Sequence, residues 1–158
     1  MTVYDGPALP AGPVSLVLPN EGLLRDALES ADLADHETTW FDRARADHAI
    51  HYFAIERDGR LIGQIMLHDI DSAAGEGMVG YHIFLPEDRG QGSGSAALQA
   101  VCRYAFEQLD LRRLVAITTH DNAASRRIAV KARFREIGPA REGPDLVCYE
   151  LRREGDDE

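Results

Sequence analysis

The chain has 158 residues, of which 44% are hydrophobic and 28% are charged, and 17 basic against 27 acidic side chains give a net charge of −10. This size and balance favour one globular domain over residues 1–158 and exclude disordered, collagen-like and mini-protein classes. No apolar run is long enough to span a bilayer and no secretory signal pattern is visible, so we expect a cytoplasmic protein without a membrane partner. The negative charge argues against nucleic acid as a partner.

The N-terminal half alternates between strand-like and helix-like stretches. Residues 1–13 are rich in proline and glycine, which favours a loose arm. The pattern then predicts a strand over 14–18, a helix from Asn20 to Leu28 and a second helix over 38–47. Two strands, 51–55 and 61–70, follow with a turn centred on Asp58-Gly59 between them.

The C-terminal half has the clearest periodicity. A strand over 78–85 stops at Pro86, and apolar residues at i, i+3, i+4 and i+7 predict a helix over 93–109. A strand over 114–118 precedes a helix over 122–132, which Asp121 or Asn122 would cap. Strands over 134–137 and 146–151, joined by the loop 138–144, lead to an acidic tail over 152–158.

The junction between the strand 78–85 and the helix 93–109 carries a glycine-rich loop, Arg89-Gly90-Gln91-Gly92-Ser93-Gly94. The first turn of a helix presents unpaired N–H groups and a partial positive charge, and glycines let a pyrophosphate approach the backbone. Arg89 would add a charge-assisted contact. A tight connection without a ligand is the alternative for this loop taken alone.

Cations gather further along the chain. The segment 112–135 holds seven cations against one anion, Asp121, which is a local balance of +6. On an acidic protein such a patch indicates a small anionic ligand, and a solvated helix face is the alternative.

The string Arg89-x-x-Gly92-x-Gly94 resembles the R/Q-x-x-G-x-G/A signature of the GNAT superfamily of acyl-CoA-dependent N-acetyltransferases, and it lies between a strand and a helix as that family requires. Asn122-x-x-Ser125 and the segment 131–134 are similar to two further landmarks of the family. Together with Gly80-Tyr81, they look most like the branch that includes the ribosomal-protein N-terminal acetyltransferases.

The resemblance implies an α/β (α+β) fold, with a mixed, mainly antiparallel sheet of six or seven strands flanked by about four helices and a parallel pair splayed open around the co-substrate. It also implies transfer of an acetyl group from acetyl-CoA to a primary amine of a small molecule or a protein N-terminus, by direct attack in a ternary complex. The acidic surface favours a cationic acceptor, for which the acid-rich stretch 32–47 is the first place to look; the solvated face of two helices is the alternative for this stretch. Monomer and homodimer both stay open.

By the same resemblance, the glycine loop would hold the CoA pyrophosphate through its backbone, and Arg126, Arg127 or Lys131 would neutralise the 3′-phosphate. Asn122 would bind the pantetheine arm, cap its helix, or do both. Strand backbone would pair with the pantetheine amides, with one N–H near the thioester to stabilise the oxyanion. The residues expected to bind CoA are therefore Ile83, Phe84, Leu85, Arg89, Gly90, Gln91, Gly92, Ser93, Gly94, Asn122, Ser125 and Arg127.

Three side chains are candidates for proton transfer. Glu76 lies thirteen residues before Arg89, which is where the histone-modifying branch of the family has its catalytic base. The ribosomal branch more often has an acid directly before Gly-Tyr, and Val79 occupies that position here. An ordinary surface carboxylate is the alternative for Glu76. His82 shares the strand parity of Glu76 and would relay a proton through water, unless it is structural. Ser125 would protonate the CoA thiolate, because Ala129 stands where many family members have tyrosine; a plain helix serine is the alternative.

Other readings are weaker. A non-catalytic acyl-CoA-binding or sensor domain would retain the loop without the chemistry. Gly92-x-Gly94-x-x-Ala97 matches a dinucleotide fingerprint by letter, but four polar residues separate it from the preceding strand. The six histidines form no metal-binding motif, so no metal is expected. Cys102 and Cys148 are expected to be reduced thiols without a covalent role.

Overall fold

The computed structural model describes residues 4–155. In this part of the chain, eight strands form one sheet in the order β1-β2-β3-β4-β5-β6-β8-β7. All neighbours are antiparallel except β5 and β6, which are parallel. The strands are β1 (Leu9–Ala11), β2 (Val14–Val17), β3 (His51–Arg57), β4 (Arg60–Asp71), β5 (Glu76–Ile83), β6 (Arg113–Thr119), β7 (Arg135–Pro139) and β8 (Leu146–Arg152). The helices are α1 (Glu21–Glu29), α2 (Trp40–Ala46), α3 (Ser93–Glu107) and α4 (Ala123–Lys131), with 3-10 turns η1 (Asp35–Thr38) and η2 (Pro86–Asp88).

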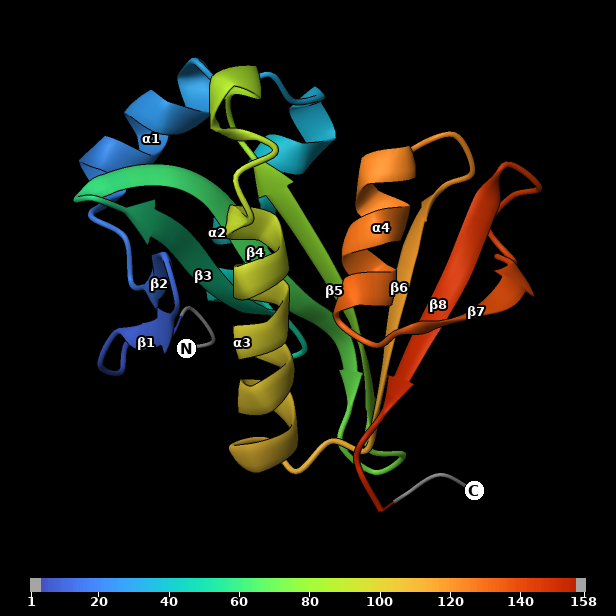
Figure 1. Cartoon of the computed structure of the whole chain (residues 1–158). Helices are drawn as coiled ribbons and strands as arrows, with labels where there is room; N and C mark the ends of the chain where they lie inside the picture. Colours follow the sequence, from blue (N-terminus) through green and yellow to red (C-terminus); the bar gives the residue numbers. More distant parts are fainter. Residues whose placement is uncertain (1–3, 156–158) are drawn as a thin grey trace.

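Helices cover both faces of the sheet. Side chains of a strand alternate between the two faces, so Phe53 and Ile65 pack in one core cluster with α3, while Tyr52 and Met66 pack in another with α1 and α2. α3 and α4 lie together on the first face (Figure 1). None of the helices within 4–155 has the length and apolarity needed to cross a membrane.

The parallel pair opens at one end. The register of β5 and β6 runs from Glu76 opposite Arg113 to Val79 opposite Ala116, and beyond this point the two strands separate. Figure 1 shows the resulting V, with α3 and α4 following the open ends of β5 and β6. The predicted fold class, including the splayed parallel pair, is thus confirmed.

The sheet has one strand more than the upper end of the predicted range of six or seven, because part of the expected loose arm forms the edge strand β1. Pro10 lies opposite Ser15 in β1, and an edge strand tolerates proline since its outer side needs no N–H donor. The ring of Tyr4 packs on Phe53 at a centroid distance of 4.9 Å. The arm's residues 1–3 and the tail's residues 156–158 lie outside the described residues, and Arg152 ends β8 instead of starting the tail.

Most predicted elements are present with boundaries shifted by a few residues. The expected helix over 38–47 is instead the 3-10 turn η1 followed by the shorter α2. The cap of α4 is Asn122, whose side-chain oxygen accepts from the Ser125 N–H at 3.0 Å. This settles the choice between Asp121 and Asn122 and brings Ser125 to the first turn of α4.

Candidate active site

The glycine loop presents backbone donors at the start of α3. Gly90 and Gly92 have φ values of +74° and +81°, which only glycine adopts freely. Within 4–155, the first α3 N–H with a backbone acceptor is that of Ala96, which donates to the Gly92 oxygen at 3.0 Å. The preceding N–H groups, from Ser93 to Ser95, have no hydrogen-bond acceptor in the described part of the chain, and such helix-end donors suit an anionic oxygen.

Two arginines flank this loop in ways that the sequence did not indicate. The Arg89 guanidinium turns toward Asp32 (3.2 Å) and the Ile83 carbonyl oxygen (3.1 Å), so it fastens the chain after α1 to the end of β5. Arg57, at the end of β3, donates to the Ser93 hydroxyl at 2.8 Å. The cation nearest the helix start is therefore Arg57, contributed by a strand distant in sequence.

A cavity of about 180 Å³ lies where β5 and β6 separate. The Tyr81 hydroxyl lies 3.2 Å from the Ser125 hydroxyl at its wall, and Asn122 and Ala129 line it from the side of α4. Burial raises the pKa of Tyr81, which keeps its phenol protonated and able to donate. The cavity thus joins the predicted Ser125 with a tyrosine that was not predicted as a site residue.

Tyr149 of β8 lines the same cavity as Ala129. Its hydroxyl accepts from Arg126 Nε at 2.9 Å. Arg126 also contacts the His120 carbonyl oxygen and Glu136, so this member of the cationic segment is engaged within the protein. Arg127 and Lys131 are exposed, and neither has an ion-pair partner among residues 4–155. Of the three cations predicted to meet the 3′-phosphate, Arg127 and Lys131 are thus the exposed ones.

The strand backbone before the loop is only partly available. The Phe84 N–H donates to the Ile62 oxygen at 2.8 Å and the Phe84 oxygen accepts from Asp32 N at 2.7 Å, so both groups are used within the protein. Alternate residues of an antiparallel strand direct their backbone groups to the same neighbour, so His82 faces β4 as Phe84 does, while Tyr81 and Ile83 face the opening toward β6. Leu85 follows β5 and its oxygen accepts from Asp88 N at 3.1 Å.

Glu76 lies apart from these groups. It is the first residue of β5, and its carboxylate is 3.5 Å from Arg113 Nη1. Six residues of strand separate it from His82, which corresponds to about 20 Å at roughly 3.3 Å per residue. Glu76 lines a different cavity, of about 500 Å³, with Met78 and Cys148. The structure therefore does not bring Glu76 together with His82 and Ser125.

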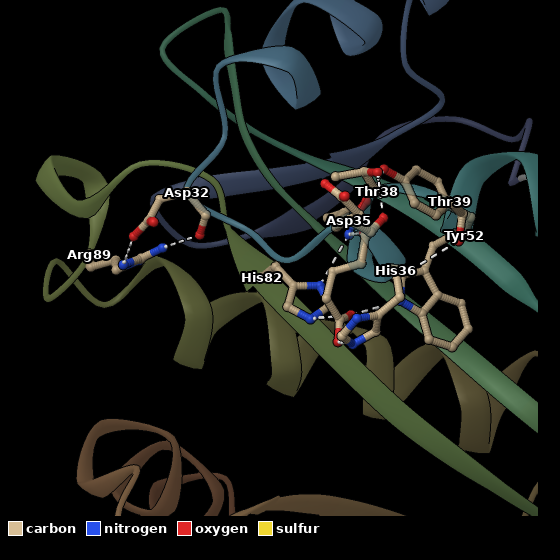
Figure 2. A network of polar contacts seen from close by, with 11 residues as sticks. Asp32, Asp35, His36, Thr38, Thr39, Tyr52, His82 and Arg89 are labelled. Carbon is tan, nitrogen blue, oxygen red and sulfur yellow. Dashed lines mark hydrogen bonds and ion pairs between the residues drawn. The ribbon is translucent and has the colours of Figure 1, made fainter.

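His82 lines the cavity in the opening and is joined to a carboxylate that the sequence did not single out (Figure 2). Its Nε2 is 2.8 Å from Glu37 Oε2, on the turn η1 between α1 and α2. Its Nδ1 is 3.1 Å from the side-chain nitrogen of the buried Gln64. Burial lowers the pKa of His82, and the opposing effect of the Glu37 charge is smaller.

Glu37 belongs to the acid-rich stretch in which we sought a cationic acceptor, and most of that stretch is used internally. Asp32 pairs with Arg89, and Asp42 pairs with Arg25 at 2.7 Å. No motif marks Glu37, because its partners come from β4, β5 and α2. Only the pairing of those elements brings them to η1.

The remaining candidates have no geometry that supports chemistry. No three His, Cys, Asp or Glu residues gather as a metal site within the described chain. Burial raises the pKa of the Cys102 thiol to about 12, which makes it a poor nucleophile at neutral pH. The single parallel pair in the sheet also lacks the successive βα units of a dinucleotide-binding fold.

Comparison with known proteins agrees with this geometry. The family model described as acetyltransferase (GNAT) domain matches residues 24–135. Two relatives come from Bacillus subtilis (strain 168). The first is named as a ribosomal N-acetyltransferase, YdaF, and is 37% identical over 101 residues, which cover 60% of this chain and 55% of YdaF. The other, the N-acetyltransferase YoaA, is 34% identical over 82 residues, covering 52% of this chain and 46% of YoaA. The matches thus span about half the length of these relatives.

Solved structures are similar over nearly the whole chain. A crystal structure of an acetyltransferase is 26% identical with a TM-score of 0.75, covering 92% of this chain and 97% of the other. The structure of RimL, a ribosomal L7/L12 α-N-protein acetyltransferase in complex with coenzyme A, has a TM-score of 0.77 at 18% identity and covers 96% of this chain and 100% of the other. At that identity, the likeness concerns the fold.

Proposed function

Because the chain belongs to the GNAT family of acetyltransferases, we propose that it transfers an acetyl group from acetyl-CoA to a primary amine by direct attack in a ternary complex. One observation carries the proposal: the opening between β5 and β6 has unpaired helix N–H groups at its rim and the Ser125–Tyr81 hydroxyl pair in its wall. The rim suits a phosphate group and the wall suits a thioester.

The donor would be held mainly by backbone groups. The N–H groups at Gly90 to Ser95 suit the pyrophosphate, with Arg57 close to the same helix start. Arg127 and Lys131, both exposed on α4, would meet the 3′-phosphate. Along β5, the backbone groups of Tyr81 and the N–H of Ile83 face the opening, whereas the Ile83 oxygen already accepts from Arg89. These groups would pair with the pantetheine amides and offer an N–H to the developing oxyanion.

Ser125 would supply the proton that the departing thiolate needs. Its hydroxyl is 3.2 Å from the Tyr81 hydroxyl, which stays protonated because burial raises its pKa. The Ser125 N–H is held by Asn122, so the cap of α4 sets the direction of this side chain. Asn122 thereby serves as a cap whether or not it also contacts pantetheine.

The names of two similar proteins support a choice of acceptor to test first. YdaF and RimL are both named as acetyltransferases that act on ribosomal proteins, and RimL is named as acting on an α-amino group. We propose the α-amino group of a protein as the first acceptor to test, with small alkylamines second. Both are primary amines that must lose a proton before they attack.

The experiment has two stages. Thermal unfolding is measured with acetyl-CoA, CoA and NADH; a ligand at 100 times its dissociation constant stabilises a protein by about 2.7 kcal/mol. Thiol release is then followed with peptides that bear a free α-amino group and with aliphatic diamines. Stabilisation by the CoA compounds and thiol release with one class support the proposal. Stabilisation without release on any amine would indicate the non-catalytic binding domain, and no stabilisation by CoA compounds would refute the loop assignment.

A further inference from the structure

Glu37 holds its carboxylate in an asymmetric way. Its inner oxygen, Oε2, lies 2.8 Å from His82 Nε2 and 3.0 Å from Trp40 Nε1. Its outer oxygen, Oε1, lies 2.8 Å from Nε2 of His36, a side chain that is 78% exposed. Figure 2 shows His36 and His82 approaching the same carboxylate. Oε2 is therefore held by His82 and Trp40. Among the described residues, Oε1 contacts the exposed His36, which solvent can replace.

Gln64 determines which atoms carry protons. The side-chain nitrogen of Gln64 is 2.7 Å from the Glu37 backbone oxygen, which can only accept, so this atom must be the NH₂ group. The Gln64 oxygen accepts from the buried Tyr52 hydroxyl at 2.8 Å, in agreement with that orientation. The second amide hydrogen then points to His82 Nδ1 at 3.1 Å.

This arrangement makes His82 a donor and not a base. Since Nδ1 accepts from Gln64, neutral His82 carries its proton on Nε2 and donates it to Glu37 Oε2. A second proton, on Nδ1, would face the Gln64 NH₂ group and be repelled by it. The carboxylate that His82 holds is the group left to receive a proton.

We propose that Glu37 is the catalytic base for the acceptor: its outer oxygen binds the ammonium group of a primary amine and takes one proton from it. The inference rests on the proposed acetyltransferase function. His82 and Trp40 keep the carboxylate fixed, and His82 ties it to the cavity where β5 and β6 part. His36 leaves Oε1 when the ammonium group arrives, at little cost because its side chain is exposed.

The protons balance. The ammonium nitrogen gives one proton to Glu37, and this proton passes to solvent. The free lone pair forms the C–N bond, and the C–S bond breaks as the tetrahedral intermediate collapses. The nitrogen loses its second proton as the amide forms, and one proton ends on the CoA sulfur through the Ser125 hydroxyl.

The test compares Glu37→Gln with Glu29→Gln, an exposed carboxylate at the end of the neighbouring helix α1. A glutamine at position 37 can accept from His82 and Trp40 through its oxygen and donate to His36 through its NH₂ group, so the turn should stay folded while the charge is lost. Thermal unfolding with and without acetyl-CoA checks both the fold and donor binding in each variant.

The kinetic readout is kcat/KM against pH, with a peptide bearing a free α-amino group as the acceptor. Without the base only the neutral amine can attack, and an α-amine with a pKa of about 7.7–8.0 is roughly one-tenth neutral at pH 7, so Glu37→Gln should lose about 10-fold at pH 7. The loss should shrink above pH 8, because an α-amine with a pKa of about 7.7–8.0 is then neutral without help. The charged or titratable groups around Glu37 are His36, Arg43 over Trp40, Tyr52 behind Gln64, His68 against Trp40, His82 itself and Arg89.

The outcomes are distinct. A loss in Glu37→Gln that fades with pH, with Glu29→Gln like wild type, supports the base assignment. Wild-type kinetics in Glu37→Gln, or a loss that stays constant with pH, would overturn it while leaving the acetyltransferase proposal intact. Absence of thiol release by the wild-type protein with every peptide and diamine would overturn both.

Discussion

The opening between β5 and β6 is built from different groups on its two sides. On the side of α3, the donors are backbone N–H groups positioned by Gly90 and Gly92. On the side of η1, the site is a network of side chains from four elements, centred on Glu37 and His82. Apart from proline, a substitution can misdirect a backbone donor but cannot remove it, whereas it can delete a side-chain contact outright. Donor binding should therefore depend on loop conformation, and acceptor chemistry on single side chains.

Two partly buried carboxylates show what such a network can do. Glu150 on β8 lies between guanidinium groups, at 2.7 Å from Arg113 and 2.5 Å from Arg135, and these hydrogen bonds lower its pKa to about 2. Glu37 is held by the uncharged Trp40 and by His82, whose buried ring favours the neutral form. Glu150 thus has a guanidinium partner on each oxygen and fastens strands, whereas Glu37 has no guanidinium partner among residues 4–155 and keeps an outward oxygen.

The largest effect on the α3 side should come from Gly92→Val. A β-branched residue at φ +81° is strained by about 1–3 kcal/mol, so the loop should change conformation and misdirect its N–H groups. Isothermal titration should show affinity for acetyl-CoA weakened by about 5- to 140-fold, the equivalent of that strain. Gly94→Ala is the matched control, because a Cβ there would contact Ile128 and Tyr81 at ordinary distances of 3.4 and 3.5 Å. Wild-type affinity in Gly92→Val would refute the loop assignment.

Glu150→Gln tests the carboxylate contrast through stability. At pH 7 the substitution should reduce the free energy of unfolding by about 2 kcal/mol, the usual worth of hydrogen bonds to charged groups. Because the pKa is lowered in the folded state from about 4.5 to about 2, this stability is present above pH 4.5 and is lost as pH falls toward 2. Urea unfolding from pH 7 to pH 2 should show wild type and variant converging.

The control for Glu150 is Glu136→Gln, which breaks the exposed ion pair with Arg126. Exposed pairs contribute little, so this variant should stay within about 1 kcal/mol of wild type at every pH. A Glu150→Gln deficit that persists unchanged at pH 2 would show that its cause is packing and not charge.

Ser125→Ala should reduce kcat about 10-fold with little change in the KM for acetyl-CoA. The loss is modest because a thiol with a pKa of about 8.5 is already a fair leaving group. The cap of α4 should survive, since Ser125 donates its backbone N–H to Asn122. Tyr81→Phe keeps the Ser125 hydroxyl and removes its partner, so its loss should be smaller. A changed KM with an unchanged kcat would assign Ser125 to binding alone.

The same contrast explains what could be predicted from sequence. The loop from Arg89 to Gly94 is contiguous, and its chemistry depends on glycine and on a helix start, both of which are local features. The mixed sheet followed from the same landmarks. The prediction of a loose arm was wrong for residues 9–11, because it relied on the preference of proline for irregular structure. These residues pair with β2 at the edge of the sheet, where a strand can contain proline.

The acceptor side could not be predicted, because its contacts depend on tertiary pairing. Glu37 meets Gln64 across 27 residues and Gln64 meets His82 across 18, and no spacing rule connects these positions. Glu76 and His82 are an even number of residues apart in β5, so they share a face of the strand. Sharing a face does not make two residues neighbours, because they can lie at opposite ends of the strand. The Arg89 guanidinium likewise faces Asp32, a partner 57 residues away.

The smallest expected effect is that of Arg127→Ala, which tests whether side chains on the α3 and α4 side matter for donor binding. Arg127 is exposed at α4, and an exposed charge pair contributes about 0.2–1 kcal/mol, so affinity for CoA should fall by a few-fold. Dephospho-CoA lacks the 3′-phosphate, and its affinity should not change. The difference should vanish in 0.5 M salt, where screening is strong. Arg103→Ala, an exposed cation on α3, serves as the control. Equal weakening of both ligands would mean that Arg127 acts through the general field at the loop and not on the 3′-phosphate.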